Sequence, residues 1–485
     1  MLVLGVVLGG GLVALWLLDT WASRQGGMSP EAGAKLRLEA IRTALTVAAG
    51  LGAGATLLVA LRRQSISERS QQYIERSQRF AEEDAREQRI TALYVAAAEQ
   101  LGSDKAAVRL AGVYALERLG QDNPKLRQTV VEVFCAYLRM PYRPPVEVLR
   151  ADGKGSPQDA TPDADVPETE TEQQRREELQ VRLTAQRLIA THLRMSDMSD
   201  GSEPVTYWRG AAGERMNLDL VGATLTNFNL STCHVDRLDL AGTRFHGEAD
   251  LNGAQFHGEA DLNGAQFHGE ADLNGARFHG EADLRETQFH GNADLSGALF
   301  HRNVYLGEAQ FHGDTYLHRA QFHSNTYLSG AQFHSNAYLS GAQFHRNAYL
   351  RWVRFHGNAH LDGVRFHGDA SADLREVRFH GNADLREVRF HGDAVLTGAL
   401  FHGDADLRGA QFHGDADLRR AQFDRGLDLA VWATPAAQLP PGWVLRYGTD
   451  AKGGLRPAVR VDGGAPPPDD HGRPAGDVDT GSDAA

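Results

Sequence analysis

The chain has 485 residues and a formal net charge of −13 at pH 7. This length allows several domains, and the negative charge disfavours attraction to nucleic-acid phosphates, so no direct nucleic-acid binding is expected. The two cysteines, Cys135 and Cys233, lack metal-ligand spacing and cannot form a disulfide framework. They are expected to be reduced, largely buried thiols.

The first 61 residues are predicted to form a two-span membrane hairpin. Residues 1–18 and 44–61 are apolar stretches without charge, each at the lower limit of length for crossing a bilayer. A loop over residues 19–43 is expected to join them. The first stretch alone also fits a signal peptide, but it lacks a basic start and a second stretch follows it. The missing basic start leaves open an initiation site upstream.

Basic residues favour a cytoplasmic position for the rest of the chain, by a small margin. Arg62 and Arg63 directly follow the second stretch, while the loop before it also carries Arg24, Lys35 and Arg37. The reduced cysteines favour the same side. We therefore expect a protein of the cell (inner) membrane, anchored in the lipid bilayer through residues 1–18 and 44–61.

A helical region is expected next. Residues 62–89 are polar and free of Gly and Pro, which is typical of an exposed juxtamembrane helix that acts as a spacer. Residues 90–195 are predicted to form a small helical domain. It contains helices that begin near Ile90, after Ser103-Asp104 and after Pro124, together with a further helix over 172–194.

Two details of the helical domain can be checked. The second helix is expected to bury Val108, Ala111, Ala115 and Leu119, which share one face at a period of 3.6 residues. Residues 144–172 are rich in Pro, Asp, Thr and Gly and are predicted to be a disordered insertion.

Periodicity dominates the chain from residue 217 to residue 429. A five-residue track of apolar residues comes first, for example at Leu220, Leu225 and Leu230, and an eleven-residue period of Phe and Leu follows from Phe256. Neither a helix, at 3.6 residues, nor a half-buried strand, at 2, explains these periods. A five-residue unit fits one short wall and one corner of a square coil, with the large residue and the Ala two positions before it pointing inward.

Alternating units of five and six residues give about 22 residues per coil, with coils stacked about 4.8 Å apart like parallel strands. Residues 217–429 then make roughly nine or ten coils. The predicted fold is mainly a β solenoid, a right-handed quadrilateral β-helix, preceded by a small all-α domain and the membrane hairpin. Residues 430–485 are expected to supply a capping segment around Trp432 and Trp443 and then a disordered tail.

Units such as Ala260-Asp261-Leu262-Asn263-Gly264 resemble the motif of the pentapeptide-repeat family, Ala-(Asp/Asn)-Leu-x-x. The segment from Glu99 to Leu119 resembles the helical region of a bacterial membrane-anchored subfamily, whose members place two membrane spans before that region and repeats after it. This resemblance implies an inner-membrane protein with cytoplasmic repeats. It implies no reaction, and we expect neither an enzyme nor a bound cofactor.

Histidine follows Phe at sixteen steps from His246 to His413, and alternate histidines should stack in two outward columns. One hypothesis is a metal- or pH-responsive surface. Zn²⁺, however, needs ligands that converge tetrahedrally at about 2.0–2.1 Å, which a flat ladder does not provide. The favoured interpretation is a solvated ladder without metal.

Acidic residues concentrate in the first coils, which is the requirement for a rod that mimics DNA and regulates a topoisomerase such as DNA gyrase. Arginines in the later coils, among them Arg375, Arg386 and Arg408, break that single-sign field. DNA mimicry is therefore kept as an alternative and not as the leading hypothesis.

The central coils carry tyrosine where other coils carry Asp. We consider these residues a candidate partner-binding band, and the alternative is an aromatic ladder that only stabilises the wall. The band comprises Tyr305, Tyr316, Tyr327, Tyr338 and Tyr349. The leading hypothesis is a membrane-tethered, non-catalytic scaffold that presents its repeat surface to an unidentified cytoplasmic protein. Self-association into a homo-oligomer is left open.

Overall fold

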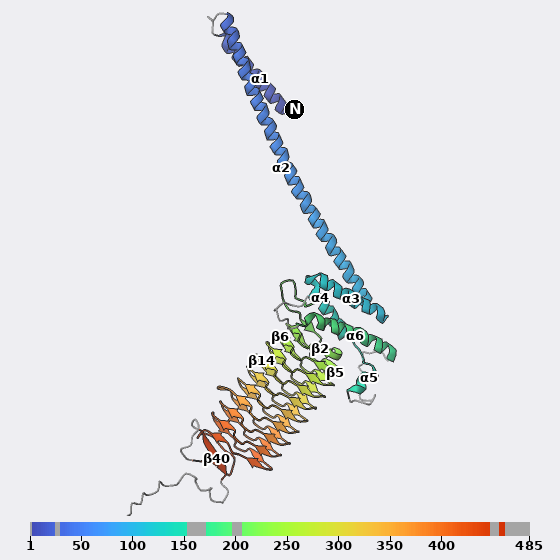
Figure 1. The fold of residues 1–485 in the computed structure, drawn as a ribbon, viewed down its shortest axis with the longest axis vertical. Coiled ribbons are helices and arrows are strands. Elements are labelled where there is room, and N and C mark those ends of the chain that lie inside the picture. Colours follow the sequence, from blue (N-terminus) through green and yellow to red (C-terminus); the bar gives the residue numbers. More distant parts are fainter. Residues whose placement is uncertain (1, 25–29, 153–170, 196–205, 447–454, 461–485) are drawn as a thin grey trace, which may run out of the picture. The chain divides into compact units, whose positions relative to one another are not determined.

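The computed structural model describes residues 2–24, 30–152, 171–195, 206–446 and 455–460 (Figure 1). The chain divides into two compact units, Met1–Ala92 and Leu93–Ala485. The first unit is helical. The second unit contains further helices and a long β-helix.

Two helices make up the first unit. Helix α1 spans Leu2–Ser23, and α2 spans Pro30–Leu101, so that α2 continues into the second unit. The predicted segmentation of residues 19–101 is therefore wrong, because most of the expected loop is helical and one helix of 72 residues replaces three separate ones. Pro30 and Glu31 suit a helix start, and no Gly or Pro interrupts residues 55–101.

One segment of α2 meets the requirements for crossing a membrane. Within the described residues, Ile41–Gln64 is the helical stretch that is long and apolar enough, with a mean hydropathy of 2.0, and none of it is buried by other parts of the chain. It contains the predicted second span. The first predicted span lies in α1, where Leu12 and Trp16 are also exposed.

Three longer helices open the second unit after α2 ends. Helix α3 spans Ala106–Asp122, the short 3₁₀ helix η1 spans Pro124–Leu126, α4 spans Arg127–Arg139, and α6 spans Glu172–Leu193. Thr171 caps α6 through a reciprocal bond with Gln174. In place of a cap on α3, the Ser103 hydroxyl accepts a hydrogen bond from the Lys105 backbone N–H.

The buried face of α3 differs from the predicted one. Ala111 and Ala115 are exposed, whereas Val113 and Leu116 are buried together with the expected Leu119. Glycines explain the difference, because they allow close approach on that face. A Cβ atom on Gly120 would lie 2.6 Å from the Trp208 ring. The prediction for α3 was wrong because it considered only the apolar side chains and did not include the glycines in the buried face.

The predicted disordered insertion begins with ordered structure. Helix α5 spans Val146–Ala151, and Glu172 accepts a hydrogen bond from the Val146 backbone N–H. The prediction is thus wrong for its first residues. Residues 153–170 lie outside the described part of the chain.

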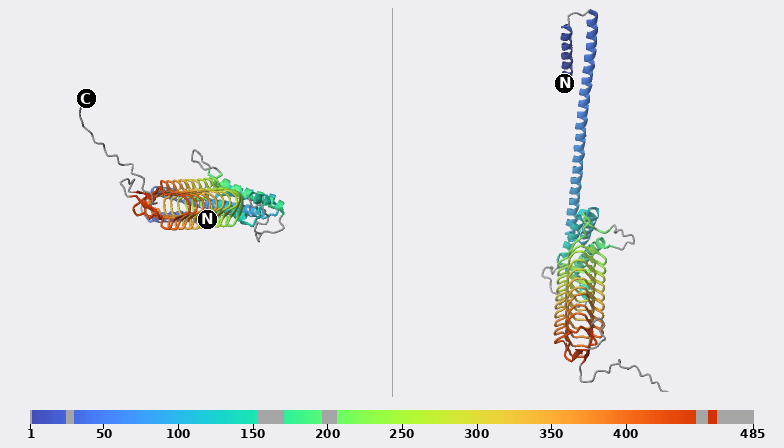
Figure 2. Two further views of the ribbon diagram at one scale, coloured as in Figure 1. Left: turned by 90° about the horizontal axis from the view of Figure 1, so that it is seen from below. Right: turned by 90° about the vertical axis from the view of Figure 1, so that its left-hand side faces the viewer.

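The β-helix is built of coils with four walls. One coil contains β7 (Ala260–Asp261), β8 (Gln266–Phe267), β9 (Ala271–Asp272) and β10 (Arg277–Phe278), and the chain then returns to the first wall at β11 (Ala282–Asp283). Parallel pairing joins each strand to its equivalent in the next coil; Phe256 pairs with Phe278, 22 residues later. The predicted coil length is confirmed. Figure 2 shows the coils stacked on one another.

Each wall is a parallel ladder of very short strands. The first wall is a 10-stranded sheet from β1 (Leu218–Asp219) to β35 (Ala416–Asp417). The second wall runs from β2 (Thr224–Asn229) and β5 (Arg244–Asp250) to β36 (Gln422–Phe423). The third continues from those two strands through β9 to β37 (Leu427–Asp428), and the fourth runs from β3 (His234–Val235) to β38 (Trp432–Ala433). The chain thus forms about 10 turns over residues 218–433.

The interior is apolar and layered, as the periodicity predicts. Ala254, Phe256 and Ala260 have no exposed surface, and Leu262 is 1% exposed. Phenylalanines of successive coils stack face to face; the Phe267 and Phe289 ring centroids lie 4.8 Å apart. Each fully buried Phe or Leu contributes roughly 1.5–3 kcal/mol before ordering entropy is subtracted. Only small residues fit opposite these stacks, because the interior is closely packed.

Corners use the left-handed backbone region, and glycine is not its only occupant. Gly264 has φ +64° at the corner between the first and second walls, whereas Glu286, Glu308 and Trp352 occupy the equivalent corner in other coils at φ +57°, +60° and +59°. A different constraint holds at Gly269, where a Cβ would lie 2.2 Å from the Gly247 carbonyl oxygen. Glycine therefore meets two separate requirements in these coils: a positive φ at some corners and close approach of backbones at others.

Both ends of the β-helix are covered. At the N-terminal end α4 contacts β1 and α6 contacts β2, and the helices share one hydrophobic core with the coils. At the other end β40 (Arg456–Arg460) pairs antiparallel with β38 and with β39 (Trp443–Leu445). These covers protect the open sheet edges. The prediction of disorder from residue 453 is wrong for β40, while residues 461–485 lie outside the described part.

Candidate interaction surfaces of the β-helix

The histidines form two columns, as predicted. On the second wall the column includes His268, His290 and His312, with ring centroids 5.1 and 5.0 Å apart. On the fourth wall it includes His257 and His279, 4.8 Å apart and 7° from parallel. Rings that are stacked in parallel direct their nitrogen lone pairs in parallel, so successive histidines do not converge on one ion.

The chemistry of the histidine columns follows from this stacking. Within the described residues, no group of three or more His, Cys, Asp or Glu side chains is arranged to hold a metal ion. Partial burial, with nearby Arg215 and neighbouring histidines adding to it, lowers the pKa of His257 to about 4. Partial burial likewise lowers the pKa of His279, His301 and His345. These four histidines, all on the fourth wall, therefore favour the neutral imidazole.

The tyrosine band is divided between two walls. Tyr305, Tyr327 and Tyr349 stack on the first wall, with centroids 5.0 Å apart. Tyr316 and Tyr338 stack on the third wall, where His360 continues the column. The second and fourth walls separate these columns, so the five residues do not form one contiguous surface.

Stacking leaves the tyrosine edges, and not their faces, toward solvent. On the first wall, Asn303 donates a hydrogen bond of 3.3 Å to the Tyr305 hydroxyl, and Asn325 and Asn347 do the same for Tyr327 and Tyr349. All five tyrosines are half-buried. The column thus offers a row of phenolic hydroxyls held in place by amides.

The outward Asp at this position has a structural role in other coils. The Asp261 carboxylate accepts a hydrogen bond from the Asn263 backbone N–H at 2.9 Å, and Asp272 does the same for Asn274 at 2.8 Å. Such bonds stabilise the turn that follows. Tyrosine cannot accept this local bond in the same way, so the central coils replace a turn contact with aromatic stacking.

Charges in the later coils are paired locally. Arg386 binds the Asp384 carboxylate at 2.6 Å and Arg419 binds Asp417 at 2.7 Å, each two residues apart. The hydrogen bond from Arg419 lowers the pKa of Asp417 to about 2. Pairs of this kind neutralise the later coils and do not supply the single-sign field that DNA mimicry requires.

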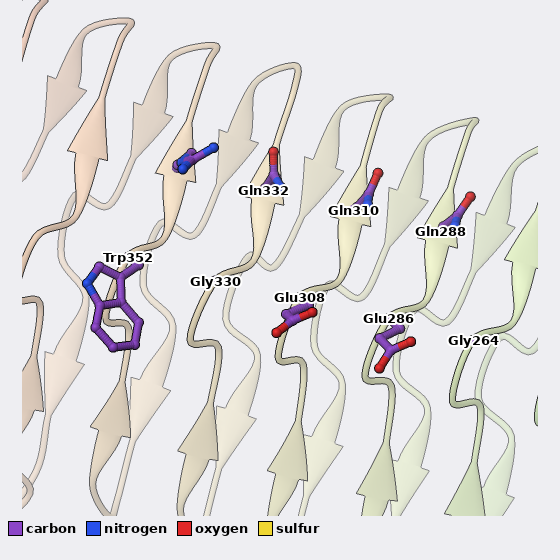
Figure 3. A pocket seen from close by; sticks show the side chains of 9 residues that line it. Gly264, Glu286, Gln288, Glu308, Gln310, Gly330, Gln332 and Trp352 are labelled. Atoms are coloured by element: carbon purple, nitrogen blue, oxygen red, sulfur yellow. The ribbon is translucent and has the colours of Figure 1, made fainter.

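An open groove follows the corner between the first and second walls, with a volume of about 530 Å³. Glu286, Glu308 and Trp352 lie in one row on successive corners, and Gly330 leaves a gap between the last two (Figure 3). A second row on the neighbouring strands is formed by Gln288, Gln310 and Gln332, and Arg354 also lines the groove. Aligning the sequence at 22-residue steps would have found these rows.

Sequence reasoning also missed a contact between the insertion and the β-helix. The Asp152 carboxylate lies 2.8 Å from His246 Nδ1 and accepts a hydrogen bond from the Gly247 backbone N–H at 2.8 Å. Hydrogen bonds from His246 and Gly247 outweigh burial and lower the pKa of Asp152. Nothing in the polar sequence around Asp152 distinguishes it from its neighbours.

The two cysteines carry no reactive chemistry. Both are free and buried, and burial raises the pKa of each thiol to about 12. Cys135 packs in α4 and Cys233 lies in the first coils. They belong to the core, because a protonated buried thiol is a poor nucleophile.

These coils define a β solenoid assembled from short repeats. The family model described as pentapeptide repeats (9 copies) matches residues 220–276, 262–310, 306–351, 328–372, 353–399 and 386–430. Residues 220–430 are thus similar to pentapeptide repeats, and β solenoids of such repeats are generally non-catalytic and suggest a protein-interaction module. No curated protein and no solved structure matches the chain.

Proposed function

We propose that this chain is a non-catalytic scaffold, held at the cell (inner) membrane and presenting its β-helix to a cytoplasmic protein. The observation that carries the proposal is the apolar segment Ile41–Gln64, which has no cover in the described chain and belongs to the same helix that enters the repeat-bearing unit. Its exposed side chains include Leu57 and Leu58, at 64% and 68%. A lipid bilayer would cover them.

The two-span arrangement forms part of the proposal. Helix α1 carries exposed Leu12, Val13 and Trp16 and is followed, after a short stretch, by the span in α2. Two spans place both ends of the hairpin on one side of the membrane. The arginines directly after the second span favour the cytoplasm for the β-helix.

The scaffold role rests on the uniformity of the walls. Catalysis needs titratable groups in distinct environments, whereas each column repeats one environment from coil to coil. Repetition suits extended contact with another protein, and tyrosine is enriched in such contacts. We propose the first-wall column Tyr305, Tyr327 and Tyr349 as one contact surface and the third-wall pair Tyr316 and Tyr338 as a second, separate one.

The membrane anchor is tested by replacing Leu57 and Leu58 with Asp. Two charges within a span oppose insertion, by up to roughly 2.5–3.5 kcal/mol each at its centre. We expect the variant to leave the membrane fraction of the native cell. Ser77→Asp, on an exposed polar turn of α2, is the control and should stay membrane-bound. Retention of the Leu57→Asp/Leu58→Asp variant in carbonate-washed membranes would contradict the proposal.

The contact surface is tested by proximity labelling in the native cell. Tyr305, Tyr327 and Tyr349 are replaced together by Asp, which occupies the same outward position at Asp261 and Asp283. We expect specific neighbours to be lost from the labelled set. Tyr316→Asp with Tyr338→Asp provides the matched change on the third wall. An unchanged labelled set for both variants would remove the tyrosine columns from the proposal.

A further inference from the structure

The groove at the corner of the first and second walls has an aromatic end. Trp352 is 55% exposed, although most large aromatic residues of the β-helix are buried. Its indole N–H donates a hydrogen bond of 3.1 Å to the Glu376 carboxylate in the next coil. That bond fixes one edge of the ring, and Gly330 on the preceding corner leaves open space beside it (Figure 3).

The groove is acidic beyond the tryptophan. Glu308 and Glu286 occupy the two corners on the far side of Gly330, and neither carboxylate takes part in an ion pair within the described part of the chain. Two carboxylates, those of Glu286 and Glu308, and one guanidinium, that of Arg354, line the groove. The surplus of negative charge beside an exposed indole favours a cation as ligand.

Between the two ends lie uncharged amides. Gln310 and Gln332 stand on successive coils of the second wall and line the same groove. A glutamine side chain both donates and accepts hydrogen bonds, so this row can bind an extended peptide backbone without selecting its sequence. The row therefore complements a peptide better than it complements a free metal ion.

We propose that the groove binds a lysine or arginine side chain of an extended partner segment. The aliphatic stem lies against the Trp352 ring, and its charged end reaches the Glu308 carboxylate across the gap at Gly330. Gln310 and Gln332 hold the backbone of the segment. This inference rests on the proposed function and names the chemistry of the partner, a basic peptide segment.

The test uses the full-length protein in detergent micelles and short capped glycine peptides with a central lysine, norleucine or glutamate. We expect the lysine peptide to quench tryptophan fluorescence saturably, and this signal to disappear in Trp352→Phe. Trp352→Ala and Glu308→Gln should weaken binding, measured by calorimetry, about tenfold and about threefold. Equal affinity for the norleucine peptide, or preference for the glutamate peptide, would overturn the inference.

Filling the gap gives a second, independent variant. Gly330→Glu introduces the side chain that Glu308 carries at the equivalent corner with φ +60°, and a Cβ there meets only ordinary contacts; the positive φ of +77° strains the new side chain, and the control variant carries the same kind of strain. We expect at least a tenfold loss of lysine-peptide affinity. Gly242→Glu, on the same row of corners and with nothing within 4 Å of its Cβ, is the control and should bind normally. Equal binding by both variants would place the peptide elsewhere.

Failure of the groove and failure of the proposed function are distinguishable. If the chain binds the lysine peptide but is not found in the membrane fraction, the binding groove is supported and the membrane anchor is contradicted. If the chain is membrane-bound but Trp352→Ala leaves its affinity for the lysine peptide unchanged, the anchor is supported and the groove is contradicted.

Discussion

Large apolar side chains meet opposite fates in the two units. Leu57 and Leu58 of α2 are mostly exposed, whereas Phe267, Phe289 and their successors in the β-helix are sealed inside the coils. Composition alone does not separate these cases, because both regions are rich in large apolar residues. The difference lies in whether the chain itself supplies the cover. The β-helix does so through its four walls, whereas nothing in the described part of the chain covers the apolar surface of α2.

The two regions also satisfy their backbones differently. Helix α2 closes its hydrogen bonds locally, within each turn, and therefore needs no neighbour. In the β-helix, successive coils pair with one another; for example the Leu262 N–H donates to the Asp283 carbonyl at 2.7 Å. Each coil thus depends on the coils above and below it, so a defect in the interior should be felt beyond its own position.

The largest expected effect separates these two fates directly. Phe300 is 1% exposed and stacks between Phe278 and Phe322 at 4.7 and 5.1 Å. Phe300→Ala should lower the free energy of unfolding by about 3–5 kcal/mol, since it leaves a cavity in a closely packed interior. Chemical denaturation in detergent, followed by circular dichroism, measures the loss. Leu57→Ala is the control and should leave the β-helix transition unchanged. An equal shift for both variants would contradict the conclusion that the chain covers Phe300 but not Leu57.

The comparison also explains what the sequence could reveal. Period alone predicted the inward Phe and Leu, the 22-residue coil and the paired histidine columns, because every coil repeats the same packing problem. The tyrosines follow the same rule: residues 11 apart alternate between opposite walls, so Tyr305 and Tyr316 could never share a surface. The same alternation places the histidines in two columns and divides the tyrosines between two walls.

Other features lay beyond the periodic signal. The continuity of α2 was missed because charges between apolar stretches suggested a loop, although nothing there breaks a helix. Asp152 contacts His246 and Gly247, which follow it by 94 and 95 positions in the sequence, and no local sequence pattern predicts these contacts. The groove depends on a single absent side chain, at Gly330, in an otherwise occupied row. Each of these features is set by context and not by repetition.

Lowering the pH should destabilise the β-helix but not the helices of the first unit, by less than the Phe300→Ala change does. Partial burial lowers the pKa of His257, His279 and His301 in the folded β-helix. Below pH 6.5, the ordinary pKa of histidine, the unfolded chain therefore binds more protons than the folded chain does. Stability is therefore full at pH 7 and falls as the pH drops through about 6.5 toward 4. The carboxylates paired with arginine resist this change, since the pKa of Asp417 is about 2.

Denaturation midpoints between pH 7 and 4.5 measure this acid sensitivity. The double change His279→Asn and His301→Asn should flatten the dependence of the midpoint on pH. Helices α1 and α2 contain no histidine, and their helical signal at low denaturant should be constant over the same range. A midpoint that rises on acidification would show that the columns are stabilised by protonation, contrary to the partial burial of their rings.

The smallest expected effect lies inside the coils and has opposite signs at two threonines. Thr326 is fully buried, and its hydroxyl has no hydrogen-bond partner among the described residues; Val304 fills the equivalent place one coil earlier. Thr326→Val removes an unsatisfied polar group without changing its shape and should stabilise the β-helix by about 1 kcal/mol. Thr287, also buried, donates from its hydroxyl to the Leu262 carbonyl at 2.9 Å. Thr287→Val should therefore cost about 1 kcal/mol. If the two variants shifted the denaturation midpoint in the same direction, hydrogen bonding would not govern polar groups inside these coils, and side-chain shape alone would decide.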